Sequence, residues 1–115
     1  MLNIEMEFKR GILFIRVDGE LTKSTINTFD ESIIPTILTN GIKYAVINME
    51  KIYAIDEEGM KALSNLNEIT SNNNGRTVIC SLSNKLKESS NVYKGMNPFY
   101  EADDELSAYR GAMKI

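Results

Sequence analysis

The chain has 115 residues and a formal net charge of −3, with 43% hydrophobic and 25% charged residues. These proportions are ordinary for a folded globular protein and exclude a disordered chain. The length fits one domain, residues 1–115, around a single core. Lysine and arginine are scattered, so no basic face indicates a nucleic-acid partner.

The residue types that are missing or rare also limit the chemistry. The sequence has no histidine, which removes the usual general base near neutral pH and the commonest metal ligand. Its one cysteine, Cys80, lies in an apolar run and fits a reducing compartment. The N-terminal residues lack the layout of a signal peptide, and no apolar run approaches the roughly 20 residues of a membrane span. We therefore expect a cytoplasmic protein that does not insert into a membrane.

The first half of the chain predicts two strands and a helix. Alternating polarity indicates an edge strand over residues 4–8, and a more apolar strand follows over residues 12–17 and stops at Asp18. Apolar residues at helical spacing then predict a helix over residues 24–40, ended by Gly41 in a left-handed cap.

The next elements alternate between strand and helix. A wholly apolar run predicts a strand over residues 44–47 that is covered on both faces, and residues 50–53 read as a loop. An apolar stripe at helical spacing then begins just after Asp56 and ends at the asparagine-rich stretch 72–75. Residues 77–80 form a second buried strand in this interpretation.

The C-terminal part predicts a weak helix over residues 83–91, a short strand over residues 98–100 and a closing helix over residues 103–113. The residues expected to face inward from the closing helix are Leu106, Tyr109 and Met113. Strands that alternate with helices indicate an α/β domain. We expect a mostly parallel sheet of about five strands, a front antiparallel hairpin and about four helices.

Three acids in a row, Asp56, Glu57 and Glu58, precede the helix that begins near residue 57. Neighbouring helical residues point about 100° apart, so consecutive carboxylates converge poorly as an acid–base pair. Their spacing also lacks the alternate oxygens of a calcium loop. Asp is instead a favoured N-cap worth about 1 kcal/mol, and Glu in the first turn complements the helix dipole. We therefore expect no catalytic site, no metal and no cofactor here.

Four segments stand out for their joint spacing rather than for any single motif. They are VDGEL at 17–21, AVINM at 45–49, IDEEG at 55–59 with Leu63, and VICSLS at 78–83. Together they resemble the STAS family of anti-sigma factor antagonists, over about residues 4–108. The resemblance implies a small STAS-like α/β domain that acts as a non-enzymatic, protein-binding regulator of transcription through partner switching.

The resemblance also implies a specific site. In that family the helix start usually reads Asp-Ser-Ser/Thr-Gly, and the second hydroxyl residue is phosphorylated by a partner that is both anti-sigma factor and kinase. The equivalent position here is Glu58, beside Glu57, so the usual serine or threonine phosphorylation cannot occur there. A second departure is Thr22, where the family commonly has an aspartate.

Two consequences of the glutamates stay open. Glu57 and Glu58 could imitate a phosphoserine, which carries about −1.5 to −2 charge, or they could form a constitutive contact with a changed partner. The hydroxyls expected on the nearby strand-to-helix loop could be phosphorylated instead, or they could cap the helix that follows. These hydroxyls belong to Thr22, Ser24 and Thr25.

The expected partner-binding surface is therefore the helix start with the neighbouring loop. Its residues are Asp56, Glu57, Glu58, Gly59, Tyr53, Thr22, Ser24 and Thr25. The expected partner is an anti-sigma factor or kinase, and the oligomeric state is left open. A soluble accessory subunit of a membrane transporter, docked on an ATPase, is the alternative function. A small carboxylate-dependent enzyme is a third, which would need a pocket with a carboxylate of raised pKa.

Overall fold

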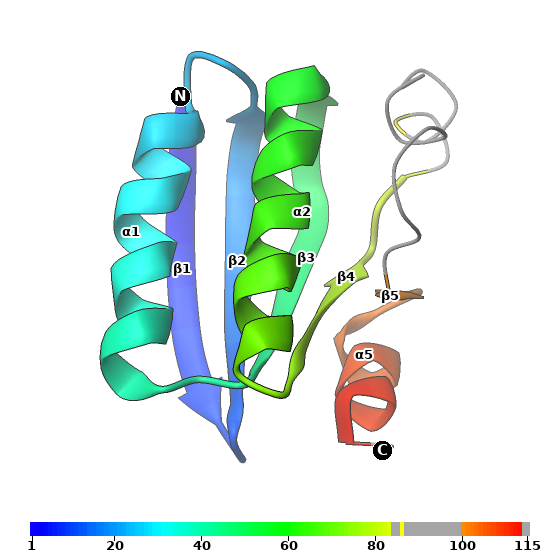
Figure 1. The fold of residues 1–115 in the computed structure, drawn as a ribbon. Helices are drawn as coiled ribbons and strands as arrows, with labels where there is room; N and C mark the ends of the chain where they lie inside the picture. The colour runs from blue at the N-terminus through cyan, green and yellow to red at the C-terminus, as the bar shows by residue number, and fades with distance from the viewer. Residues whose placement is uncertain (84–85, 87–99, 114–115) are drawn as a thin grey trace.

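A five-stranded sheet in the order β1-β2-β3-β4-β5 forms the centre of the molecule (Figure 1). The computed structural model describes residues 1–83, 86 and 100–113. The strands are β1 (Leu2–Lys9), β2 (Ile12–Leu21), β3 (Tyr44–Ile55), β4 (Arg76–Cys80) and β5 (Tyr100–Ala102). The helices are α1 (Ile26–Asn40), α2 (Glu57–Asn72) and α5 (Glu105–Met113).

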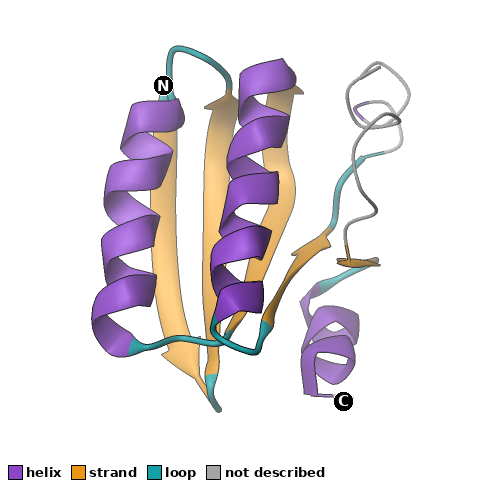
Figure 2. Cartoon of the chain, in the orientation of Figure 1, coloured by secondary structure: helices purple, strands orange, loops and turns teal. Residues whose placement is uncertain are grey.

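The strand directions confirm the predicted architecture. β1 and β2 form an antiparallel hairpin, and β2, β3, β4 and β5 are parallel neighbours. Helices α1 and α2 connect parallel strands and lie side by side on one face of the sheet (Figure 2). Of the helix predicted over residues 83–91, only residues 83 and 86 are described, and the first two residues of the strand predicted over 98–100 lie outside the described residues. Within the described part, no helix is both long and apolar enough to cross a bilayer.

The period of two along the strands divides the core between the two faces of the sheet. Leu13 and Ile15 of β2 belong to the larger core beneath α1 and α2. Phe14, which lies between them, points to the other face, where a smaller core also includes Cys80 of β4 and Ala108 of α5. Burial raises the pKa of the Cys80 thiol to about 11, as expected for a thiol that packs as a small hydrophobe.

Strands β2 and β3 are longer than the sequence suggested. The prediction that the second strand stops at Asp18 is wrong, since β2 continues to Leu21. The prediction of a loop over residues 50–53 is also wrong, because this stretch belongs to β3. The extensions of the two strands pair with each other. Asp18 of β2 lies opposite Lys51 of β3, just after a shift in the register of the two strands. Because one face of this extension is open to solvent, its polar residues resemble a loop.

Helix α5 is rotated differently from the predicted helix. Leu106 was expected to face inward, but its side chain is 58% exposed, so that prediction is wrong. Ala108 is fully buried instead, and Tyr109 is half-buried. The physical reason is Glu105, whose carboxylate binds Arg16 on β2 and turns the next residue outward. The side chain of Met113 lies outside the described residues.

Candidate functional site

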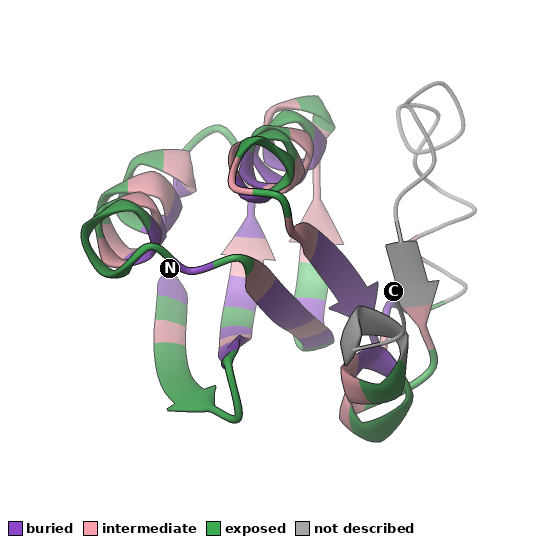
Figure 3. Cartoon of the chain, turned by 60° about the horizontal axis from the view of Figure 1, so that its bottom comes forward, coloured by how far each residue is buried: buried purple, intermediate pink, exposed green. Residues whose placement is uncertain are grey.

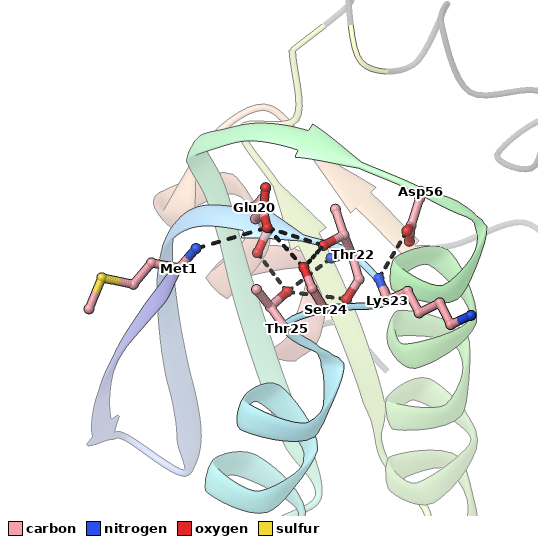
Figure 4. A network of polar contacts seen from close by, with 7 residues as sticks. All are labelled: Met1, Glu20, Thr22, Lys23, Ser24, Thr25 and Asp56. Carbon is pink, nitrogen blue, oxygen red and sulfur yellow. Dashed lines mark hydrogen bonds and ion pairs between the residues drawn. The ribbon is translucent and has the colours of Figure 1, made fainter.

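The candidate site lies where the carboxyl ends of β2 and β3 meet at one end of the sheet. Because the two strands are parallel, the loop after β2 (residues 22–25) and the start of α2 become neighbours, as Figure 4 shows. The backbone N–H of Asp56 donates to the carbonyl of Leu21 at 3.3 Å. The structure therefore brings the two predicted parts of the surface together.

Asp56 joins these two parts through its side chain. Its Oδ1 accepts a hydrogen bond from the N–H of Gly59 at 2.8 Å, which confirms the predicted N-cap of α2. Its Oδ2 accepts the backbone N–H of Lys23 at 2.9 Å (Figure 4). One carboxylate therefore caps the helix and holds the β2–α1 loop against it, so Asp56 is a positioning residue.

Gly59 is buried in the first turn of α2 and has no side chain to offer a partner. A Cβ at this position would overlap the backbone carbonyl of Leu21 and press on Ile55. Glycine is therefore needed so that α2 can start directly against the end of β2. Gly59 contributes to the surface indirectly, because it lets the first turn of α2 pack directly against the end of β2 and so determines where that turn lies.

Glu57 and Glu58 project from this fixed start into solvent. Their side chains are 63% and 42% exposed. The ammonium of Lys61 lies 3.6 Å from the Glu57 carboxylate and 3.8 Å from that of Glu58. Lys61 is not among the residues predicted for this surface, although its spacing of three and four residues from the glutamates is the usual signal for such pairs.

The β2–α1 loop holds its hydroxyl groups around Glu20. The Ser24 hydroxyl donates to Glu20 Oε1 at 3.0 Å, and the Thr22 hydroxyl donates to the same oxygen at 3.4 Å. The two hydroxyl oxygens are 3.0 Å apart, and the amino group of Met1 lies 3.9 Å from Glu20 Oε1 (Figure 4). Glu20 therefore organises the loop, a role that the sequence analysis did not assign to it.

Thr25 differs from the other two hydroxyl residues because it is buried. It occupies the N-cap position of α1, but its side chain makes no capping bond to that helix. Its hydroxyl donates to the carbonyl of Glu20 at 2.9 Å and accepts the backbone N–H of Thr22 at 3.0 Å. Thr25 therefore stabilises the loop through buried hydrogen bonds to its backbone. Of the three hydroxyl residues, Ser24 is exposed and Thr22 is half-buried.

Tyr53 is 68% exposed near the end of β3, three residues before Asp56. An aromatic ring with one polar group is well suited to a protein contact.

Among the described residues there is no group of three or more His, Cys, Asp or Glu side chains that could hold a metal ion. A hollow of about 540 Å³ between β1, β2 and β3 is lined by other residues, Arg16 and Asn48 among them, and not by the start of α2.

The comparisons with known proteins agree with this architecture. The family model of the STAS domain matches residues 3–95. A relative named "Anti-sigma F factor antagonist", from Paenibacillus polymyxa, is 26% identical over 110 residues, which cover 93% of this chain and 92% of the relative.

Solved structures show the same fold. The anti-sigma factor antagonist SpoIIAA in its unphosphorylated form matches with a TM-score of 0.76 and 19% identity, over 98% of this chain and 100% of that chain. A murine anion transporter of the Solute Carrier 26 family matches with a TM-score of 0.77 and 13% identity, over 95% of this chain and 19% of that chain. The chain therefore belongs to the STAS domain family and has the fold of the anti-sigma factor antagonists.

Proposed function

We propose that this chain, as a single domain, is a non-enzymatic regulatory module that binds an anti-sigma factor through the acidic start of α2. The observation that carries the proposal is the pair of exposed carboxylates, Glu57 and Glu58, on a helix start that Asp56 fixes to the β2–α1 loop. Membership of the STAS family and the relative named for anti-sigma F factor antagonism support the choice of partner. A rigid, solvated ridge suits docking better than catalysis, which needs converging groups.

Glu58 stands at the position where the resemblance expects a phosphorylated hydroxyl. The contact is therefore constitutive in this proposal, with no switch at Glu58. A phosphoserine would concentrate about −1.5 to −2 charge on one group. Here two carboxylates share the ammonium of Lys61, which leaves a net charge of −1 for the three side chains. This spread of charge supports a constitutive contact better than imitation of a phosphate.

The surface in this proposal has separate positioning and contact residues. Glu57, Glu58 and Tyr53 touch the partner, and Ser24 and Thr22 lie at the margin on the adjoining loop. Asp56, Gly59 and Thr25 hold these groups in place from below. A basic patch on the partner would complement the carboxylates and steer its approach.

The experiment captures partners from native lysate with tagged wild-type protein and identifies them by mass spectrometry. The Glu58→Arg variant reverses the charge at the contact, so we expect capture of the anti-sigma factor to fall at least about tenfold. Glu68→Arg is the matched control, because Glu68 is exposed further along the same helix. It should retain capture, and all three proteins should have nearly the same thermal midpoint.

Three outcomes would change the proposal. Unchanged capture by Glu58→Arg, or a large loss of its thermal stability, would remove the contact role of this residue. Capture by a Glu57→Ser/Glu58→Ser variant alone would show that the glutamates are a built-in off state. Capture of transporter subunits would favour the accessory-subunit alternative, for which the fold likeness to part of an anion transporter is the supporting observation.

A further inference from the structure

Strand β1 forms one margin of the sheet, and among the described residues it pairs with β2 alone. It is eight residues long, Leu2–Lys9, and most of its residues are exposed (Figure 3). The outer edge of such a strand presents backbone N–H and C=O groups that can pair with another strand. The edge therefore needs either protection or a partner.

The side chains on one face of β1 favour a partner. Met6 and Phe8 lie opposite core residues of β2, on the face covered by α1 and α2. Yet Met6 is 36% exposed and Phe8 is 61% exposed, because the core ends at this margin. Two large apolar side chains therefore stand beside an open strand edge.

The other face of β1 carries the charged residues Glu5, Glu7 and Lys9. The Glu7 carboxylate accepts a hydrogen bond from Arg16 Nη1 at 3.1 Å, and that of Glu5 lies 3.9 Å from the same nitrogen. Within the described part of the chain the Lys9 ammonium forms no ion pair, although its charge helps to lower the pKa of Glu105. Charges on an edge strand usually prevent indiscriminate pairing, and their order determines which pairings they permit.

We propose that β1 is a self-association edge, at which a second copy of this chain adds its own β1 antiparallel, across a two-fold axis through Glu7. The sheet then continues from one copy into the other. This interface is separate from the start of α2 and does not depend on the proposed function.

The register follows from charge complementarity. With the axis at Glu7, Lys9 of each copy lies opposite Glu5 of the other, and Phe8 lies opposite Met6 on the apolar face. Two-fold symmetry makes each of these pairs occur twice. The two Glu7 side chains meet at the axis, where each accepts a hydrogen bond from the Arg16 of its own copy, a guanidinium that also binds Glu105.

The neighbouring registers are less favourable. An axis at Met6 places Glu5 opposite Glu7 of the second copy, so two like-charged pairs replace the two opposite-charged ones. An axis at Phe8 shortens the shared ladder to residues 7–9, because β1 ends at Lys9. Only the axis at Glu7 combines opposite charges, apolar contacts and a ladder of residues 5–9.

Sedimentation velocity tests the association, at concentrations from about 10 μM to 1 mM because a single added strand is a small interface. We expect a concentration-dependent dimer of the wild type. Glu5→Lys and Lys9→Glu should each weaken it at least about tenfold, since each change creates two like-charged pairs. The double variant Glu5→Lys/Lys9→Glu should restore it. Glu68→Lys on α2 is the matched control and should leave it unchanged.

Disulfide trapping tests the register. In the Glu7→Cys variant the introduced thiols face each other at the axis, so mild oxidation with oxidised glutathione should link two copies. Asn3→Cys on the same face should not be linked, and the native thiol of Cys80 is buried in both variants. A wild type that stays monomeric up to 1 mM, a double variant that fails to recover, or equal linking at the two positions would overturn the proposal.

Discussion

Helices α2 and α5 begin with the same kinds of residue but use them in opposite ways. In α2, Asp56 accepts the N–H of Gly59 at 2.8 Å, and in α5, Asp104 accepts that of Ser107 at 2.8 Å. Both aspartates therefore satisfy a donor at a helix start. The glutamates that follow differ, because Glu57 points to solvent and Glu105 points to the sheet.

The partners of Glu105 show the difference. Arg16 donates to its two carboxylate oxygens from Nε and Nη2, both at 2.9 Å, and Asn48 donates to Oε2 at 2.9 Å. The hydrogen bond from Arg16 holds the pKa of Glu105 below its usual value, and the same bond raises the pKa of Arg16. In α2, by contrast, Lys61 lies 3.6 Å from Glu57, and both side chains are more than half exposed.

The comparison teaches that position over the sheet, rather than the residue type, decides what an acidic first turn does. Where a cation on the sheet lies within reach, as Arg16 does for Glu105, the glutamate attaches its helix to the sheet. Where the aspartate already attaches the helix start to a loop, as Asp56 does, the glutamates remain exposed to solvent. Three substitutions test this division, from the largest expected effect to the smallest.

Asp56→Ala should have the largest effect, because it removes both the cap of α2 and the bond to the Lys23 N–H. We expect a loss of about 1 to 2 kcal/mol in the free energy of unfolding, measured by urea denaturation. Asp56→Asn is the control, since its amide oxygen can still accept the Gly59 N–H while its NH2 cannot accept the Lys23 N–H, so it should recover about half of the loss. Equal losses in both variants would show that the helix cap contributes little and that the carboxylate's bond to the Lys23 N–H matters at this position.

Glu105→Gln should lower the free energy of unfolding by about 1 kcal/mol at pH 7. The ion pair with Arg16 is partly exposed, and the amide oxygen of glutamine can still accept a hydrogen bond from Arg16. The folded-state pKa of Glu105 is lowered, so its ionised form contributes stability above the unfolded pKa of about 4.3 and loses it as the pH falls through the folded value. Urea denaturation from pH 7 down to about pH 3 should therefore show the two proteins converging. A constant difference across this range would mean that the carboxylate is not held by Arg16.

Glu57→Gln should have the smallest effect, within about 0.5 kcal/mol, because exposed helix pairs contribute little. Lys61→Met removes the same contact from the other side and should give a similar value by urea denaturation. A loss above about 1 kcal/mol in either variant would show that these side chains have a structural role. Their exposure would then no longer mark them as free for a partner.

The sequence by itself determined the features that depend on local periodicity. The stripe of Phe29, Ile33 and Ile37 in α1 is fully buried, as its spacing requires. Asp56 caps α2 because an N-cap bond spans only three residues. The hairpin and the buried parallel strands follow from alternation and from short apolar runs, so the fold class could be read without coordinates.

Only the tertiary structure decided the features that depend on partners distant in the chain. Arg16 and Glu105 are 89 residues apart, so no local pattern could predict that their contact turns Leu106 outward. The extension of β3 into its predicted loop depends on pairing with β2, and the hydroxyl of Thr25 bonds within its loop rather than to its helix. Local spacing fixes which element forms, whereas contacts across the sheet fix its length, its rotation and the side chains it leaves free.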